Sequence, residues 1–189
     1  MAIETEKKYR LLKDDRERVL KRLQEVDAEF RGEEFEENTL YAGGGIDSRN
    51  CVLRLRRVGG SSILTFKERF PSSSSIKRQR EEETHVEDAD AMAAILNALG
   101  FRPAVVYEKR RSTWRVGGTE VVLDDLPFGF FMEIEGEETA ILAAEQLLRV
   151  TDLTPEMATY PQLAIQHGTK VGDVTEARFQ SVLLKQSPE

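Results

Sequence analysis

Two pairs of glutamates at two-residue spacing lie in the sequence, one near its start and one near residue 134. Glu4, Glu6 and Lys8 occupy alternate positions near the start, and Glu133 and Glu135 repeat the Glu-x-Glu spacing. Side chains two residues apart project from the same face of a β-strand, so each pair would present its carboxylates together. Clustered carboxylates suit hard divalent cations such as Mg²⁺ or Mn²⁺. One such stretch is usually a solvated edge strand, whereas a repeated one favours a metal site.

Basic residues show the same alternation in three further segments. They are Arg54, Arg56, Lys67, Lys109 and Arg111. Leu53 and Leu55 hold the alternate positions beside the first pair, so the charged and apolar sets lie on opposite faces. Arginine forks and lysine ammonium groups suit phosphate oxygens. A polyphosphate bound with a divalent cation would therefore satisfy both the basic and the acidic sets.

The elements that carry these residues must form a sheet with one charged face. About eight alternating segments predict strands, and apolar residues at helical spacing predict helices near residues 14–30, 88–99 and 137–150, with Gly32 ending the first. An apolar outer face covered by helices leaves the charged face inside, so the sheet must close. The expected fold class is α+β, an eight-stranded antiparallel β-barrel or tunnel with a charged lumen and helices packed on the outside. An open sheet with a salt-bridged, solvated face is the simpler alternative, but the repeated pairs disfavour it.

The inward face of segment 76–86 is ambiguous because charges occupy both parities. The two choices present either Glu81, Glu83 and His85 or Arg78, Arg80 and Glu82. The first choice is favoured because it leaves Ile76 and Val86 facing the outer apolar layer. A β-bulge would reverse it.

Length and composition restrict the class of protein. The 189 residues, 40% of them hydrophobic, predict a single domain over 1–189, with the motifs within 1–150 and a C-terminal helical extension over 151–189. A formal net charge of −7 argues against a nucleic-acid partner. The single cysteine excludes an internal disulfide, and no apolar run suits a signal peptide or membrane span, so a cytoplasmic location is expected.

The ordered series of motifs resembles the CYTH superfamily, the triphosphate tunnel metalloenzymes. Glu4-x-Glu6-x-Lys8 matches the Glu-x-Glu-x-Lys signature of that family. The series continues with Leu53-Arg54-Leu55-Arg56, Leu64-Thr65-Phe66-Lys67, Glu81-x-Glu83, Glu108-Lys109-Arg110-Arg111, Leu123-Asp124 and Phe131-Met132-Glu133-Ile134-Glu135-Gly136. The resemblance covers most of residues 1–150. It implies an eight-stranded tunnel that binds triphosphate or nucleoside triphosphate with a divalent metal.

The resemblance also implies a role for each matching residue. The implied phosphate ligands are Arg54, Arg56, Lys67, Lys109 and Arg111, and the implied metal ligands are Glu4, Glu6, Glu133 and Glu135. Asp124, with Glu81 or Glu83, would hold a second metal or orient the cationic side chains. Lys8, with Glu4 and Glu6, would take part in catalysis. Gln79 stands where many members carry a basic residue, so the resemblance does not imply a phosphate contact at this position.

Three functions are compatible with these residues. The leading expectation is a metal-dependent phosphohydrolase acting on inorganic triphosphate, thiamine triphosphate or a nucleoside triphosphate. The alternative is a class IV adenylyl cyclase that converts ATP to cyclic AMP and pyrophosphate, although the His-Phe pair associated with the N-terminus of some bacterial cyclases is absent. The third is a non-catalytic polyphosphate-binding module. The expected partner is the small triphosphate substrate, and family analogy is compatible with a homodimer.

Overall fold

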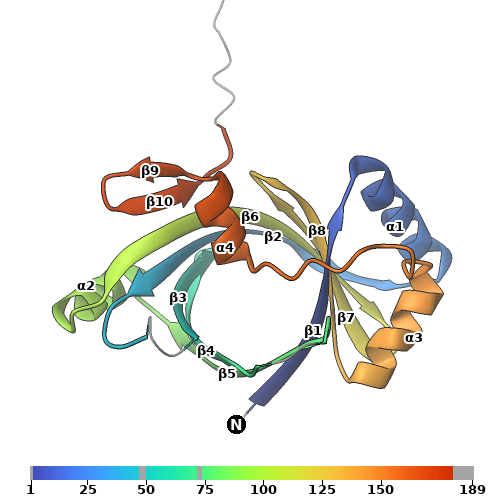
Figure 1. The fold of residues 1–189 in the computed structure, drawn as a ribbon, viewed down its shortest axis with the longest axis horizontal. Helices are drawn as coiled ribbons and strands as arrows, with labels where there is room; N and C mark the ends of the chain where they lie inside the picture. The colour runs from blue at the N-terminus through green and yellow to red at the C-terminus, as the bar shows by residue number, and fades with distance from the viewer. Residues whose placement is uncertain (1, 47–49, 72–73, 181–189) are drawn as a thin grey trace, which may run out of the picture.

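The computed structural model describes residues 2–46, 50–71 and 74–180. Its main feature is a closed barrel (Figure 1). The eight barrel strands are β1 (Ala2–Leu11), β2 (Glu29–Ala42), β3 (Cys51–Val58), β4 (Ser61–Arg69), β5 (Lys77–Val86), β6 (Arg102–Val116), β7 (Thr119–Leu126) and β8 (Gly129–Glu135). Their order around the barrel is β2-β3-β4-β5-β1-β8-β7-β6, all antiparallel, and β6 returns to pair with β2. The predicted fold class is thereby confirmed.

Four helices in the described part of the chain pack outside the barrel. They are α1 (Lys13–Glu25), α2 (Ala89–Ala98), α3 (Glu138–Leu148) and α4 (Tyr160–His167). Figure 1 shows α1 and α3 together on one side, α2 on the opposite side and α4 near the mouth of the barrel. None of the four has the length and apolar character that crossing a bilayer requires.

Alternation places one apolar set of side chains outside and the charged set inside. Outward residues such as Tyr9 of β1, Val121 of β7 and Ile134 of β8 are fully buried in a cluster that includes side chains of α1 and α3. Leu55 of β3 is fully buried in a second cluster with Leu96 of α2. Burial of this apolar layer holds each strand at one parity, because a shift of one residue would turn the charged set outwards.

The first helix is shorter than the sequence predicted. It ends at Glu25 rather than near Phe30, and β2 begins at Glu29. Phe30 instead packs against Trp114, its partner in the β2–β6 ladder, with tilted rings whose centroids are 4.8 Å apart. Gly32 lies within β2, next to a register shift, and does not end the helix. Long-range pairing with β6 therefore overrides the local helical preference of this segment.

The C-terminal region is less helical than predicted. It contains α4, but also β9 (Thr169–Val171) and β10 (Val174–Ala177), which the sequence analysis did not anticipate. β10 pairs in parallel with β6, alongside the stretch where β6 also pairs with β2. The segment between α3 and α4 is bound to β1, since Glu156 N donates to Lys8 O at 2.7 Å. This bond brings the start of α4 to the barrel. The predicted extension also covers residues 181–189, which lie outside the described residues.

Candidate active site

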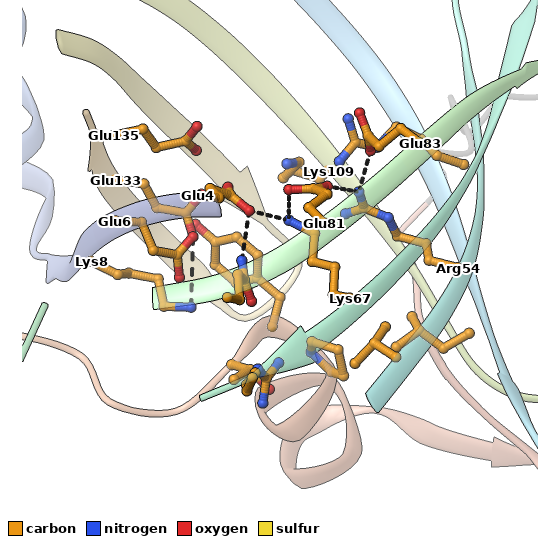
Figure 2. Close-up of a pocket in the computed structure, with 18 of the residues that line it drawn as sticks. Glu4, Glu6, Lys8, Arg54, Lys67, Glu81, Glu83, Lys109, Glu133 and Glu135 are labelled. Atoms are coloured by element: carbon orange, nitrogen blue, oxygen red, sulfur yellow. Dashed lines mark hydrogen bonds and ion pairs between the residues drawn. The ribbon is translucent and has the colours of Figure 1, made fainter. Parts of the chain in front are cut away.

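The barrel encloses a cavity of about 250 Å³ whose wall is dominated by charge (Figure 2). Seven basic side chains line it: Lys8, Arg54, Arg56, Lys67, Arg69, Lys109 and Arg111. Seven glutamates also line it: Glu4, Glu6, Glu81, Glu83, Glu120, Glu133 and Glu135. The cavity thus contains every basic residue, and all but one acidic residue, that the sequence assigned to the site. The exception is Asp124. Arg69 and Glu120 also line the cavity, although the sequence did not assign them to the site.

The inward face of β5 is the one that the sequence favoured. Glu81 and Glu83 line the cavity, as does Gln79. His85, of the same parity, is exposed and is not part of the lining. Arg80 lies on the outside, where its Nε is 3.2 Å from a carboxylate oxygen of Glu82.

Three carboxylates converge on one wall. Glu4 and Glu6 of β1 and Glu135 of β8 each offer an oxygen within 4.8 Å of the other two. They meet because Glu6 pairs directly with Glu135 in the β1–β8 ladder. Burial, reinforced by the charge of Glu133, raises the pKa of Glu6, and burial together with its acidic neighbours raises the pKa of Glu135 to about 8 despite the opposing charge of Arg111. A divalent cation would relieve the repulsion, and carboxylate oxygens are its preferred ligands. The donor set therefore fits a metal.

Glu4 is the member of this cluster that also contacts the cationic side. Its Oε2 accepts from Lys67 Nζ at 2.8 Å and from Gln79 Nε2 at 2.7 Å. Lys67 Nζ is in addition 2.9 Å from Glu81 Oε2. Burial opposes ionisation of Glu4, but the hydrogen bond from Glu81 and the charge of Lys67 outweigh it and lower its pKa to about 2. The same arrangement raises the pKa of Glu81 to about 8, through burial and its hydrogen bond to Glu4. The opposite directions of the two pKa shifts favour an ionised Glu4 beside a protonated Glu81.

The opposite wall holds arginines and a lysine around a buried glutamate that the sequence analysis missed. Glu36 of β2 is fully buried, with Oε2 3.3 Å from Arg56 Nε and 3.2 Å from Lys109 Nζ. Burial opposes its charge, yet Lys109 and Arg56 hold the pKa of Glu36 far below its usual range. Asn38, on the same face, donates to Glu36 and accepts from Arg56. Glu36 therefore fixes the orientation of two cations that face the cavity.

Asp124 lies behind the cations and does not line the cavity. Its two oxygens accept from Arg111 at 2.7 and 2.6 Å, and it is fully buried. Lys109 Nζ is 3.5 Å from an oxygen of Asp124, and the hydroxyl of Tyr160 donates to the other Asp124 oxygen at 2.8 Å. Of the two roles left open by the sequence, orienting cationic side chains fits this position, because Asp124 is outside the three-carboxylate cluster.

Lys8 lies at the end of the cavity that α4 closes. Only 2% of Lys8 is exposed, and its Nζ is 3.7 Å from Glu133 and 4.1 Å from the ring centroid of Tyr160. Thr159, Tyr160 and Pro161 line the cavity at this end. The sequence predicted a helical extension over 151–189, within which α4 lies, but gave Tyr160 no role. No local sequence signal identifies Tyr160 as a residue of the site, because its place at the cavity depends on the hydrogen bond between Glu156, which precedes α4, and Lys8 of β1.

Comparison with known proteins agrees with this architecture. A Methanocaldococcus jannaschii protein named as a candidate adenylate cyclase is 29% identical over 150 residues, covering 77% of this chain and 83% of that protein. A solved Pyrococcus horikoshii OT3 protein superposes with a TM-score of 0.71 at 25% identity, covering 86% of this chain and 98% of the other. A Hippeastrum protein, named as a candidate adenylyl cyclase with a dominant triphosphatase activity, has a TM-score of 0.65 at 18% identity, covering 86% and 94%, and its likeness shows the fold alone. The CYTH domain model matches residues 2–160, and the chain belongs to the CYTH family.

Proposed function

We propose that this protein is a metal-dependent phosphohydrolase that cleaves a triphosphate substrate inside the tunnel. The observation that carries the proposal is that an acidic wall and a basic wall line the same cavity. Glu4, Glu6 and Glu135 gather on one, and Arg54, Arg56, Lys109 and Arg111 face the same cavity. A receptor for anions alone has no use for so many acids, whereas a polyphosphate and a divalent cation together use both walls.

The residues of the chain have separate tasks in this reaction. Glu4, Glu6 and Glu135 would hold Mg²⁺ or Mn²⁺, which supplies positive charge to the phosphate oxygens when bound. The arginines and Lys109 would bind the substrate and stabilise the charge that develops on the phosphoryl and leaving oxygens. Glu36 and Asp124 keep these cations in place before the substrate arrives, so that little reorganisation is required.

Lys8 would position the attacking water. Its ammonium group lies against the Tyr160 ring and is 3.7 Å from Glu133, and each ammonium has three donors. A water bound here would lie beside the acidic wall, close to the place where the phosphorus must be held. Because Lys8 is almost fully buried, its donors are directed by the protein rather than by bulk solvent.

Adenylyl cyclase activity is the second candidate, since relatives of this chain are named as candidate adenylate cyclases. It requires a surface for adenine and a bound ribose 3′-hydroxyl in place of water. The apolar side chains of the lining are few: Leu40, Val52, Tyr107, Tyr160 and Pro161. The hydroxyl of Tyr160 is already bonded to Asp124. A lining so rich in charge favours the triphosphate moiety over the base, which supports hydrolysis.

A substrate panel tests the proposal. Purified protein with Mg²⁺ or Mn²⁺ is given tripolyphosphate, thiamine triphosphate or ATP, and both phosphate and cyclic AMP are quantified. We expect phosphate release from at least one triphosphate, faster than cyclic AMP forms from ATP. Glu6→Gln should lose this activity, whereas the control Glu17→Gln, at an exposed position, should keep it. Faster cyclic AMP formation would favour the cyclase. Tight binding without turnover, surviving substitution of Glu4 and Glu6, would instead favour a polyphosphate-binding module.

A further inference from the structure

Arg69 stands out among the basic residues of the cavity because it forms no ion pair with any acidic residue that the structure describes. Each of the other six basic side chains of the lining has a carboxylate oxygen within 4.0 Å. Arg69 also lines the cavity, from the last position of β4, yet it forms no ion pair within the part of the chain that the structure describes. The contrast extends to the outer surface, where Arg80 pairs with Glu82 and Glu68.

Arg69 lies beside an uncharged residue of the cavity lining, Gln79. Arg69 is directly opposite Gln79 in the β4–β5 ladder, and Gln79 is directly opposite Glu4 in the β5–β1 ladder. The Gln79 amide donates to Glu4 at 2.7 Å and brings no charge. Directly opposed residues on one face of a ladder have Cβ atoms only about 5 Å apart. A guanidinium at position 69 can therefore reach the region that a basic residue at position 79 would serve.

A second cation strengthens the positive charge at this end. Lys77, on the same face of β5, interacts electrostatically with Lys8 and Arg69, and burial followed by the charge of Lys8 lowers its pKa to about 8. Among the described residues its Nζ donates to the backbone carbonyl of Glu156, at 3.3 Å, and to no carboxylate. Burial likewise lowers the pKa of Arg69, and the charge of Glu6 opposes this. The charges of Glu6 and Glu133 act on this group of cations, but among the described residues neither Arg69 nor Lys77 forms an ion pair with them. An anion from outside the chain would therefore be favoured beside these two cations.

We propose that Arg69 is a further substrate-binding residue, which donates to phosphate oxygens of the triphosphate and supplies the positive charge that position 79 lacks. This inference rests on the proposed function for the identity of its ligand. The planar guanidinium presents paired donors that match phosphate geometry. Removal of the charge should weaken tripolyphosphate binding at least about tenfold, because charge-assisted hydrogen bonds are among the stronger ones.

The test is calorimetric titration of the full chain with inorganic tripolyphosphate in the presence of Ca²⁺, with released phosphate measured at the end. Arg69→Gln removes a positive charge from the cavity. The control Arg80→Gln removes a positive charge from the outer face of the adjacent strand. Arg69→Gln with Gln79→Arg moves the cation across the ladder. We expect a rise in Kd of about tenfold or more for the first, a change within about twofold for the second, and recovery to within about threefold for the double variant.

Two results would overturn the inference: an Arg69→Gln Kd within twofold of the parent, or equal weakening by Arg80→Gln. Arg69→Lys, which keeps the charge but not the fork, should bind with intermediate affinity and serves if Arg69→Gln does not fold. A parent protein that binds tripolyphosphate but hydrolyses no triphosphate would refute the proposed function alone, because the comparison of Kd values still decides the role of Arg69. A parent that binds no tripolyphosphate would refute both.

Discussion

Replacing Glu135 by glutamine should stabilise the metal-free protein at alkaline pH. The side chain of Glu135 is 23% exposed and is held beside Glu4 and Glu6, with Arg111 Nη1 no closer than 4.0 Å. Burial and the neighbouring carboxylates raise its pKa from the ordinary 4.5 to about 8, against the opposing charge of Arg111. Glutamine keeps the shape of the side chain but cannot ionise, so it removes the repulsion without opening a cavity.

The size of the effect follows from proton binding. Between pH 4.5 and 8 the unfolded chain has released the Glu135 proton while the folded protein retains it, so stability falls as pH rises. Each pH unit in this window costs about 1.4 kcal/mol, and the full window sets an upper limit of about 5 kcal/mol. Coupling to Glu4 and Glu6 divides this cost among the three groups. We therefore expect a gain of about 1 to 3 kcal/mol for Glu135→Gln at pH 8.5 and no gain below pH 4.5.

Thermal unfolding in EDTA at pH 4.5, 6.5 and 8.5 measures the difference. For a chain of this length about 1 kcal/mol corresponds to roughly 2–4 °C in Tm, so Glu135→Gln should melt at least about 2 °C above the parent at pH 8.5. The exposed Glu17→Gln is the matched control and should follow the parent at every pH. Mg²⁺ or Mn²⁺ should stabilise the parent more than the variant. A variant that is equal to or less stable than the parent at pH 8.5 in EDTA would refute this account of the acidic wall.

Three further predictions concern other parts of the tunnel. Glu4→Gln should weaken Mg²⁺-dependent hydrolysis by about tenfold to a hundredfold, yet strengthen metal-free tripolyphosphate binding in calorimetry, because Lys67 loses the carboxylate 2.8 Å from its ammonium group. Tyr160→Phe removes one hydrogen bond to a buried aspartate but keeps the ring, so chemical denaturation should show a loss of about 1 kcal/mol, with an unchanged KM. Gly168→Ala would place a methyl group 2.5 Å from a carbonyl oxygen of α4 and should cost about 1–3 kcal/mol, whereas Gly118→Ala, 3.7 Å from its nearest neighbour, should be tolerated in the same assay.

Period-two alternation predicted the faces of the strands because burial acts on each strand separately. Leu53 and Leu55 must face the outer layer, so Arg54 and Arg56 must face inwards, whatever the neighbouring strands are. The same reasoning identified the two Glu-x-Glu pairs. That they occupy adjacent strands, with Glu6 opposite Glu135, is a property of the ladder order, which single-strand periodicity does not contain.

Features that depend on contacts between distant segments escaped the sequence analysis. Glu36 belongs to a stretch rich in glutamate on both parities, so no alternation distinguishes its inward face. Arg69 ends its strand just before Phe70 and Pro71, where the alternating pattern stops. The early end of α1 has a similar cause, since the pairing of Phe30 with Trp114 becomes available only when β6 is in place. In each case a long-range partner decided the outcome.

The balance of charge in the tunnel is compatible both with folding in the absence of a ligand and with the proposed binding of a highly charged substrate. Its lining holds seven basic side chains and seven glutamates, while the whole chain has a net charge of −7, so the excess negative charge lies outside the cavity. Ion pairs such as Lys67 with Glu4 limit the cost of burying these groups in the empty state. In the proposed function the same pairs would be exchanged on binding: a divalent cation would take the carboxylates, and the ammonium and guanidinium groups would become free for phosphate. Each ligand therefore removes the partner that competes with the other, and metal and triphosphate should strengthen each other's binding by the same factor.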